Sequence, residues 1–253
     1  MTAANATRAG GRRVPCEKCP LMKYKIFRPF NERQLQFVSQ FKTGEFHAES
    51  GATLFLQNTN SPHLYTVLSG WAFRYKMLPD GKRQILNFAL PGDLLGLQAS
   101  IFNEMQHSVE TLTNVVLCTF AREKVWSLFA DHPGLAFDLT WLASREEQIL
   151  DENLLSVGQR SATARAAYLL LHLFTRAEQV GLTAGNTIKF PFNQQHVADT
   201  LGLSLVHTNR TLKKLSARKL IRWKDKVFYL LDREGLRVTA RVEEGGDRQR
   251  PYI

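Results

Sequence analysis

The chain has 253 residues, of which 44% are hydrophobic and 22% are charged, and its formal net charge is +10 at neutral pH. This length and apolar content suffice for two domains of ordinary size, and the positive charge suits a polyanionic partner. No apolar run reaches the roughly 18 residues of a membrane span, and the N-terminal segment lacks the apolar core of a signal peptide. Three cysteines are an odd count for a secreted disulfide framework. We therefore expect a cytoplasmic protein without membrane contact.

The N-terminal segment, residues 1–29, opens with a basic, glycine-containing stretch that predicts disorder. It continues into Pro-Cys-Glu-Lys-Cys, in which Cys16 and Cys19 have C-x-x-C spacing. This spacing lets two thiolates reach one metal ion or one edge of an iron–sulfur cluster, or close a small redox disulfide. The alternative is that the two thiols have neither role. A C-x-x-C pair supplies only half of a metal site and needs further ligands elsewhere in the chain.

Residues 30–132 have the pattern of an antiparallel β-domain that follows one short helix. The helix is predicted over Asn31–Phe41, with Asn31 as its N-cap. Short strand-like runs then alternate with turns every ten residues or so, for example at Pro79-Asp80-Gly81 and Pro91-Gly92-Asp93. We expect an antiparallel barrel or roll. Unusual backbone conformations are expected at Gly70, Gly81, Gly92 and Gly96.

A long helix is predicted within residues 133–157, over Leu135–Val157, with Pro133 and Gly134 at its start. Its apolar stripe is too long for one small barrel to cover, so we expect a partner helix from a second copy of the chain. Packing against its own domain is the alternative. Gly158 is expected to end this helix. The residues of the stripe are Leu135, Leu139, Leu142, Ile149, Leu150, Leu154 and Val157.

The C-terminal domain, residues 158–240, begins with a helix predicted over Ala162–Val180 and contains the most specific motif of the chain, at Gln194–Leu215. Two short helices are expected there. Gly202 suits the turn between them because glycine adopts a positive φ without steric cost, and Ser204 suits the N-cap of the second helix. Leu203 is expected to be a buried plug. This order is typical of a helix-turn-helix whose cationic second helix enters the DNA major groove, and an ordinary core hairpin is the alternative.

A polar turn between two apolar runs follows the motif and predicts a β-hairpin, the wing of a winged helix. Lysines at its tip either contact phosphate or are merely solvated. The tail, residues 241–253, has two glycines and mixed charge, which predicts disorder. The residues expected to contact DNA are Ser204, Val206, His207, Asn209, Arg210, Lys213, Lys214, Lys224 and Lys226.

The order of these parts, an α+β chain with an antiparallel β-roll, a long dimerisation helix and a C-terminal winged helix-turn-helix, resembles the Crp/Fnr family of bacterial transcription regulators. The resemblance covers nearly the whole chain, from Cys16 to about Leu236. It implies a cyclic-nucleotide-binding-like roll, a homodimer on a pseudo-palindromic site in double-stranded DNA, and contact with RNA polymerase. The motifs that carry it are Leu90–Leu97 (LPGDLLGL), the Asp80-Gly81 hairpin and Leu201–Leu215 (LGLSLVHTNRTLKKL).

The sequence departs from the members of this family that bind cyclic AMP. Those members carry Gly-Glu after the PGD turn, to hold the ribose hydroxyl, and Arg-Ser further on, to hold the phosphate. The corresponding stretches here are Gly96-Leu97-Gln98 and His107-Ser108. The phosphate would lack its bidentate guanidinium partner. The sequence therefore argues against cyclic AMP, while another small ligand in the roll stays open.

The oxygen-sensing branch of the family holds a 4Fe–4S cluster with an N-terminal cysteine group and one cysteine from the roll. Cys16 and Cys19 resemble the first pair, and Cys118 lies where the roll ligand is expected. Lys25 stands in place of the remaining cysteine, and lysine is a poor ligand. Cys118 on a strand is by default a buried small hydrophobe. A cluster or metal on these three cysteines, another cysteine-based redox sensor, and a regulator without a cofactor that is controlled by its abundance all remain open.

The recognition helix also departs from the family pattern. Members often have a glutamate in its first turn that accepts a hydrogen bond from cytosine, and an arginine four residues on. Val206 replaces the glutamate and can contact a thymine methyl group, while Arg210 matches the arginine and is the expected main anchor. Ser204 and Thr208 are expected to cap or position the backbone.

An enzyme is the competing class. The sequence shows no nucleophile with a base, no phosphate loop and no zinc-ligand run in a supporting context, and the pair His47 and Glu49 is interpreted as solvated. We therefore do not expect an enzyme. A roll-domain signalling subunit without DNA binding is the other alternative.

Overall fold

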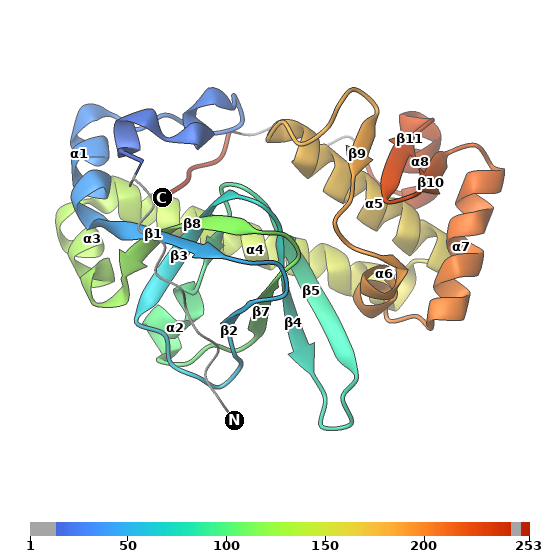
Figure 1. Ribbon diagram of the computed structural model, residues 1–253, viewed down its shortest axis with the longest axis horizontal. Coiled ribbons are helices and arrows are strands. Elements are labelled where there is room, and N and C mark those ends of the chain that lie inside the picture. The colour runs from blue at the N-terminus through green and yellow to red at the C-terminus, as the bar shows by residue number, and fades with distance from the viewer. Residues whose placement is uncertain (1–13, 244–248) are drawn as a thin grey trace. The chain divides into compact units, whose positions relative to one another are not determined.

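The computed structural model describes residues 14–243 and 249–253, which form two compact units (Figure 1). Of the described residues, the first unit contains 14–74, 89–144 and 249–253, and the second contains 75–88 and 145–243. The expected disorder of residues 1–13 and 244–248 concerns segments outside the described ranges. Within those ranges, no helix has both the length and the apolar character that a bilayer crossing requires.

The predicted roll is built from two antiparallel four-stranded sheets, with strand orders β1-β8-β3-β6 and β2-β7-β4-β5. Its core is a cluster of small and medium apolar side chains around Val67, Leu95 and Leu117, with Phe55 and Met105 at its edges. The strands are β1 (Lys42–Ala48), β2 (Thr53–Phe55), β3 (His63–Ser69), β4 (Ala72–Met77), β5 (Arg83–Ala89), β6 (Leu94–Leu95), β7 (Ser108–Thr111) and β8 (Val115–Ala121).

Strand β1 and the short strand β6 are elements of the roll that the sequence did not predict, and β1 is the longer of the two. It pairs with β8 from Lys42 opposite Phe120 to Ala48 opposite Val115, with a register shift near Gly44. Its polar, weakly alternating sequence, KTGEFHA, hides the strand pattern. The strand matters because it places Lys42 beside Cys118.

The short helices of the first unit frame the roll. The prediction of α1 (Glu32–Phe41) with Asn31 as its N-cap is confirmed, because the Asn31 side chain accepts from the Gln34 backbone N–H and the Gln34 side chain accepts from the Asn31 N–H. Positive φ angles occur at all four glycines named above. The remaining elements are the 3₁₀ turns η1 (Cys16–Lys18), η2 (Pro20–Lys23) and η3 (Arg122–Lys124) and the helices α2 (Leu97–Phe102) and α3 (Val125–Asp131).

The long helix α4 (Pro133–Gln159) confirms the predicted element but ends later than expected. Gly158 lies inside the helix, and the chain breaks at Ser161, whose hydroxyl caps the next helix by accepting from the Ala164 N–H. A glycine is tolerated in the last turn because its cost there is only about 1 kcal/mol. Ser161 is the stronger signal.

The second unit contains the C-terminal winged helix-turn-helix. A three-stranded sheet, in the order β10-β11-β9, accompanies four helices. Strand β11 pairs with both neighbours in antiparallel fashion. The elements are α5 (Ala162–Gln179), β9 (Thr187–Lys189), α6 (Gln194–Leu201), α7 (Leu205–Ala217), β10 (Ile221–Lys224), β11 (Val227–Leu230) and α8 (Arg233–Ala240).

The expectation of disorder is wrong for the last five residues of the tail. Residues 249–253 belong to the roll unit, and Tyr252 and Ile253 are 3% and 4% exposed. In Figure 1 the dark red end of the chain runs beside the blue N-terminal segment. The composition of the tail is polar and glycine-containing on average, so it masks three apolar residues at its end.

Candidate nucleic-acid interface and cysteine cluster

The two helices of the predicted motif are set by local capping. The side chain of Asn193 accepts from the backbone N–H groups of Gln195 and His196 and so starts α6. Gly202, with φ +64°, ends α6, and the Ser204 hydroxyl accepts from the His207 N–H at 3.2 Å to start α7. The predicted turn and cap are therefore confirmed. Leu203 is only partly buried, which corrects the expectation of a buried plug.

One face of α7 is packed and the other is cationic. Thr208, Thr211, Leu212 and Leu215 are buried against the unit, which agrees with a positioning role for Thr208. The opposite face shows Val206, 62% exposed, together with His207, Arg210, Lys213 and Lys214, all exposed. Their spacing of three and four residues places them on one helical face.

Asn209 lies between these two faces. It is partly buried, and its carboxamide oxygen is enclosed without a hydrogen-bond partner among the described residues. In this conformation Asn209 presents less to a partner than the sequence predicts. An enclosed carboxamide oxygen without a partner is costly, so we regard Asn209 as a group that gains from rearrangement on binding.

The cations of α7 differ from three of the arginines of the same unit. Arg160, Arg233 and Arg237 are paired with Glu152, Glu178 and Glu234 at 2.6–3.0 Å. Arg210, Lys213 and Lys214, in contrast, form no ion pair with any residue in the described ranges. Exposed and unneutralised cations on one helical face are suited to phosphates and guanine edges.

The wing forms as predicted, as a hairpin with a two-residue turn. Lys224 pairs with Val227, and the two turn residues, Asp225 and Lys226, have φ angles of +52° and +66°. Two positive φ angles define a type I′ turn, which matches the twist of the strands. Lys224 and Lys226 are exposed at the tip, and Lys189 of β9, which the sequence analysis missed, lies opposite Val227.

An open groove of about 360 Å³ joins the wing to the start of the helix-turn-helix. The N-terminus of α6, the first residue of α7 and the wing turn line it. The Asp225 carboxylate lines the groove and the Gln195 amide donates to Asp199, while Asn193, Gln194 and Lys226 bring further amide and ammonium donors. These groups suit an anionic backbone, because most protein–DNA hydrogen bonds go to phosphate and sugar oxygens. The sequence analysis did not include the amides, since their role depends on the fold.

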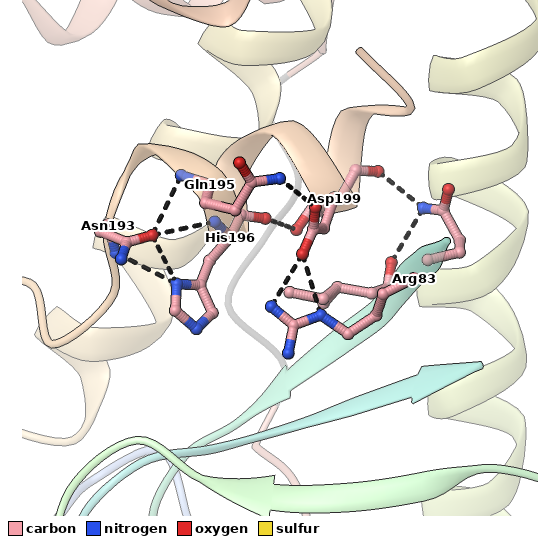
Figure 2. A network of polar contacts seen from close by, with 8 residues as sticks. Arg83, Asn193, Gln195, His196 and Asp199 are labelled. Atoms are coloured by element: carbon pink, nitrogen blue, oxygen red, sulfur yellow. Dashed lines mark hydrogen bonds and ion pairs between the residues drawn. The ribbon is translucent and has the colours of Figure 1, made fainter. Parts of the chain in front are cut away.

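A polar network fixes α6 to strand β5, within the second unit (Figure 2). The Arg83 guanidinium binds the Asp199 carboxylate at 2.8 and 2.9 Å, and the Gln195 side chain donates to the same carboxylate at 2.6 Å. Gln84 donates to the carbonyl oxygen of Thr200 at 2.9 Å. Burial and the nearby Arg83 charge lower the pKa of His196, while Asp199 opposes them. The hairpin that contains Asp80-Gly81 therefore positions the first helix of the DNA-binding motif.

The three cysteines lie in the roll unit, within electrostatic reach of one another. Cys118 on β8 is 7% exposed, and Cys16 and Cys19 are partly buried in η1 and at its end. After the larger effect of burial, charges on Cys19 and Cys16 raise the pKa of Cys118, and a charge on Cys16 raises the pKa of Cys19. Lys42 completes the group, because it hydrogen-bonds the Cys118 side chain and is held by the Glu45 carboxylate at 2.7 Å.

Burial dominates the acidity of this cluster. Desolvation raises the pKa of Cys118 to about 12, although Lys42 lowers it, and burial likewise raises the pKa of Cys19. Both groups are thiols at neutral pH. Burial lowers the pKa of Lys42, but its net pKa is raised because Glu45 and the nearby cysteines favour the ammonium.

This donor set does not fit a four-thiolate iron–sulfur cluster. The sequence has three cysteines, and the ammonium of Lys42 already contacts the Cys118 side chain. In the part of the chain that the structure describes, no three His, Cys, Asp or Glu side chains are grouped as metal ligands, and this includes His47 and Glu49. Metal ligation requires thiolates, which this burial disfavours.

The stretches that differ from cyclic-AMP binders are part of the packed roll. Gly96 has φ +94° and begins α2, followed by Leu97 and Gln98. His107 and Ser108 are 6% and 5% exposed, and the Ser108 hydroxyl accepts from the Gln57 N–H at 3.0 Å. The position at which binders place an arginine is thus taken by a buried histidine.

Comparison with known proteins agrees with this architecture. Residues 45–132 match the cyclic nucleotide-binding domain family and residues 164–239 match the Crp-like helix-turn-helix domain family. The transcriptional activatory protein AadR of Rhodopseudomonas palustris is 34% identical over 66% of this chain and 69% of its own length. The nitrogen fixation regulation protein FixK of Bradyrhizobium diazoefficiens is 35% identical over 67% and 70%.

Two further comparisons cover more of the chain. The fumarate and nitrate reduction regulatory protein of Vibrio cholerae is 25% identical over 96% of both chains. The structure of FixK2 from Bradyrhizobium japonicum superimposes with a TM-score of 0.72 at 23% identity, over 79% of this chain and 98% of that one. Together with the exposed cationic helix and the wing, these similarities show that the chain belongs to the Crp/Fnr family of DNA-binding transcription regulators.

Proposed function

We propose that this protein acts as a homodimer on a pseudo-palindromic DNA site, with one α7 helix in each of two successive major grooves. The unpaired cationic face of α7 carries the proposal, because Arg210, Lys213 and Lys214 are exposed without a protein partner in the described ranges. A two-fold dimer reads two half-sites about 34 Å apart, one helical turn of DNA. RNA polymerase is the proposed protein partner at the promoter.

The second half of α4 supplies the surface for dimerisation. Of the predicted stripe, Leu135, Leu139, Leu142 and Ile149 are buried within the chain itself. Leu150, Leu154 and Val157 are 42%, 73% and 39% exposed, and they share one face because they are spaced by four and three residues. Apolar residues at this spacing on a long helix favour helix–helix association.

A charge on this face tests the dimer. In Leu154→Glu we expect a monomer by sedimentation and a loss of about a hundredfold or more in affinity for a two-half-site duplex, because linked half-sites gain 10²–10⁴ in affinity. Gln148→Glu places the same charge on another exposed face of α4 and serves as the control. A monomeric wild-type chain, or unchanged binding by Leu154→Glu, would contradict the proposal.

DNA binding itself is tested by its salt dependence. Between 50 and 200 mM salt we expect the affinity for duplex DNA to fall by roughly 10³-fold or more, because neutralised phosphates release counterions. A signalling subunit without DNA binding would show no duplex binding at either salt concentration.

The second proposal is that the cysteine cluster tunes DNA binding as a thiol switch. The convergence of Cys16, Cys19 and Cys118 beside Lys42 favours this over inert thiols, since the sequence separates Cys118 from the other two by about a hundred residues. A thiolate attacks a peroxide oxygen and becomes a sulfenic acid while hydroxide leaves and takes up a proton. A second thiol displaces water and forms the disulfide. Two thiols and one peroxide thus give one disulfide and two waters.

This switch is tested on the reduced protein with a stoichiometric peroxide. We expect mass spectrometry to find a disulfide that includes Cys118 and a changed DNA affinity, both reversed by dithiothreitol and absent in Cys118→Ser. Oxidation without an effect on DNA binding would refute the switch. Iron and sulfide in an anaerobic preparation would instead require a cluster.

A further inference from the structure

Residues 249–253 lie on the roll unit as an added strand. The Arg250 N–H donates to the Ile26 carbonyl at 2.8 Å, and the Arg28 N–H donates to the Arg250 carbonyl at 2.9 Å, so that Arg250 pairs with Phe27 in parallel fashion. The Gln249 side chain donates to the Lys25 carbonyl at 3.0 Å. Such strand addition gives affinity through the main chain and leaves specificity to the side chains.

The Arg250 side chain fills a site at the PGD turn. Its guanidinium binds the Asp93 carboxylate at 2.7 Å and the Pro91 carbonyl at 3.0 Å, and it covers the Phe27 ring at 4.8 Å. The side chains of Arg250 and Asp93 are 14% and 3% exposed. Planar arginine suits this site, because it combines a carboxylate contact with stacking on an aromatic face.

Tyr252 and Ile253 anchor the segment in an apolar groove. The Tyr252 ring lies 5.2 Å from the Phe27 ring and 4.7 Å from the Phe30 ring. The Thr66 hydroxyl donates to the carbonyl oxygen of Ile253. The walls of the groove thus come from two places, the N-terminal segment at Lys25–Phe30 and the roll at Thr66 and Pro91–Asp93.

The same segment borders the cysteine cluster. Burial raises the pKa of Tyr252, and Cys19 and Cys16 lie near enough to raise it further. The Tyr252 hydroxyl is buried and has no hydrogen-bond partner among the described residues. Because Arg250 contacts both walls, Tyr252 contacts the N-terminal segment and Ile253 contacts the roll, the segment holds the cysteine-bearing N-terminal segment against the roll.

We propose that the roll carries a peptide-binding groove whose ligand is the chain's own segment 249–253, and that this segment acts as a latch that keeps the N-terminal segment closed over Cys118. With the latch seated, Cys118 is sheltered; with the latch released, the N-terminal segment opens and all three thiols become accessible. The latch proposal rests on these contacts, and it does not depend on whether the thiols regulate DNA binding.

The test is native alkylation of Cys118 by a maleimide, followed by mass spectrometry. Removal of residues 249–253 should speed labelling of Cys118 by an order of magnitude, about tenfold or more, because the free energy of local opening falls. Tyr252→Ala should do the same. Tyr252→Phe is the matched control, because it keeps the ring in the groove and removes only the unpartnered hydroxyl, so its rate should equal the wild-type rate.

Two further measurements keep the outcome decisive. A peptide with the sequence of residues 249–253, added at millimolar concentration to the shortened chain, should restore slow labelling, whereas the same peptide with alanine for tyrosine should not. Amide hydrogen exchange at Arg28 should accelerate in the shortened chain, while exchange in α5 stays unchanged and reports an intact second unit.

Unchanged Cys118 labelling in a folded shortened chain would overturn the latch. The segment of a second copy is the other occupant to distinguish. If a cysteine-free full-length chain, mixed with the shortened chain, restores protection at micromolar concentration, the latch acts between copies and the intramolecular proposal is wrong.

Discussion

Helix α7 and the cysteine cluster are both sites that the sequence singled out, and the structure treats them in opposite ways. Most of the side chains of α7 that were predicted to contact DNA are exposed, Arg210 and Val206 among them. Those of the cluster are enclosed: Cys118 is 7% exposed and its pKa is raised to about 12. The α7 face is built from residues within one helix, whereas the cluster joins residues about a hundred positions apart.

The difference follows from what each site has to contact. A DNA duplex is large and brings its own charge, so its reader must be exposed and must leave its cations free. A thiol that responds to a small reactive molecule needs access and a thiolate, and the burial of Cys118 limits both, so its reactivity depends on local opening of the cluster. The two sites should therefore respond differently to mutation: changes around the cluster alter stability and access, and changes on α7 alter DNA binding alone.

The largest expected effect is a loss of stability in Gly92→Ala, which changes the roll unit and leaves α7 untouched. In Gly92→Ala we expect a loss of about 2–3 kcal/mol of unfolding free energy, because φ is +88° and the new methyl group meets the Phe27 ring. Chemical denaturation measures this loss. Cys118 should become easier to alkylate.

Gly44→Ala is the matched control, since no atom lies within 4 Å of the added methyl group and its φ is outside the left-handed region. Its stability should stay within about 0.5 kcal/mol of wild type. The contrast between the two regions fails if Gly92→Ala weakens DNA binding by the folded protein as strongly as it lowers stability.

Truncation of Arg210 is the converse experiment. Arg210→Ala should cost roughly 1–3 kcal/mol of DNA-binding free energy and relax specificity at one base pair per half-site, with stability unchanged. Anisotropy titrations against a set of singly substituted duplexes measure both effects. Arg210→Lys keeps the positive charge but lacks the planar guanidinium with its paired donors. If this variant binds DNA more tightly than Arg210→Ala but is no more specific, Arg210 contacts a base. Unchanged operator preference in Arg210→Ala would contradict the assignment.

The Arg83–Asp199 pair tests whether the β4–β5 hairpin positions α6. A double-mutant cycle with Arg83→Ala and Asp199→Ala should give a coupling energy of about 1 kcal/mol, since the pair is partly buried and two guanidinium nitrogens contact one carboxylate oxygen. The cycle is measured by denaturation. A parallel cycle on Arg233 and Glu178, both more than 40% exposed, should give a smaller coupling. Equal coupling energies in the two cycles would mean that the Arg83–Asp199 pair does not hold α6 in place.

A smaller effect is expected at the wing. Lys226→Ala should weaken binding to all duplexes about equally and lower the salt slope by about 1 for each phosphate that the variant no longer neutralises. Anisotropy at four salt concentrations gives the slope. Glu234→Ala on α8, away from the groove, should leave the slope unchanged. If the loss of DNA affinity in Lys226→Ala depends on the duplex sequence, this lysine contacts a base and not a phosphate.

The smallest effect is a pH dependence at the start of α6. Because the pKa of His196 is lowered in the folded chain, its neutral form is favoured there, so its contribution to stability is present above the usual histidine pKa and is lost as the pH falls below it. Denaturation at pH 7.5 and 5.5 should show a smaller loss in His196→Gln than in wild type. Equal losses would show that His196 does not contribute.

The sequence predicted best those elements whose signals are local. Asn31, Gly202 and Ser204 were predicted at the caps and the turn that they occupy, and Asn193, which was not predicted, follows the same capping rule. The type I′ turn at the wing tip was likewise indicated by a polar turn between apolar runs. Helix α4 could be predicted from its long apolar stripe.

The features that the sequence missed depend on distant residues. Strand β1 has a polar sequence and exists because β8 pairs with it. Tyr252 and Ile253 look like part of a polar tail until Phe27, Phe30 and Thr66 enclose them. Lys42 gains its role from a contact with Cys118, some seventy-six positions away. No local rule encodes such partners, because tertiary context overrides local propensity.

The most direct test of the account is selection of bound duplexes from a random pool by the wild-type protein, followed by the same selection with Arg210→Ala. We expect the enriched DNA to contain an inverted repeat whose half-sites lie about one helical turn, or 34 Å, apart, and we expect the variant to lose the preference for one base pair symmetrically in both halves. The claim that two copies of α7 read the DNA would be contradicted if the wild-type protein enriched no sequence or only a single half-site. It would also be contradicted if Arg210→Ala enriched the same repeat as the wild-type protein.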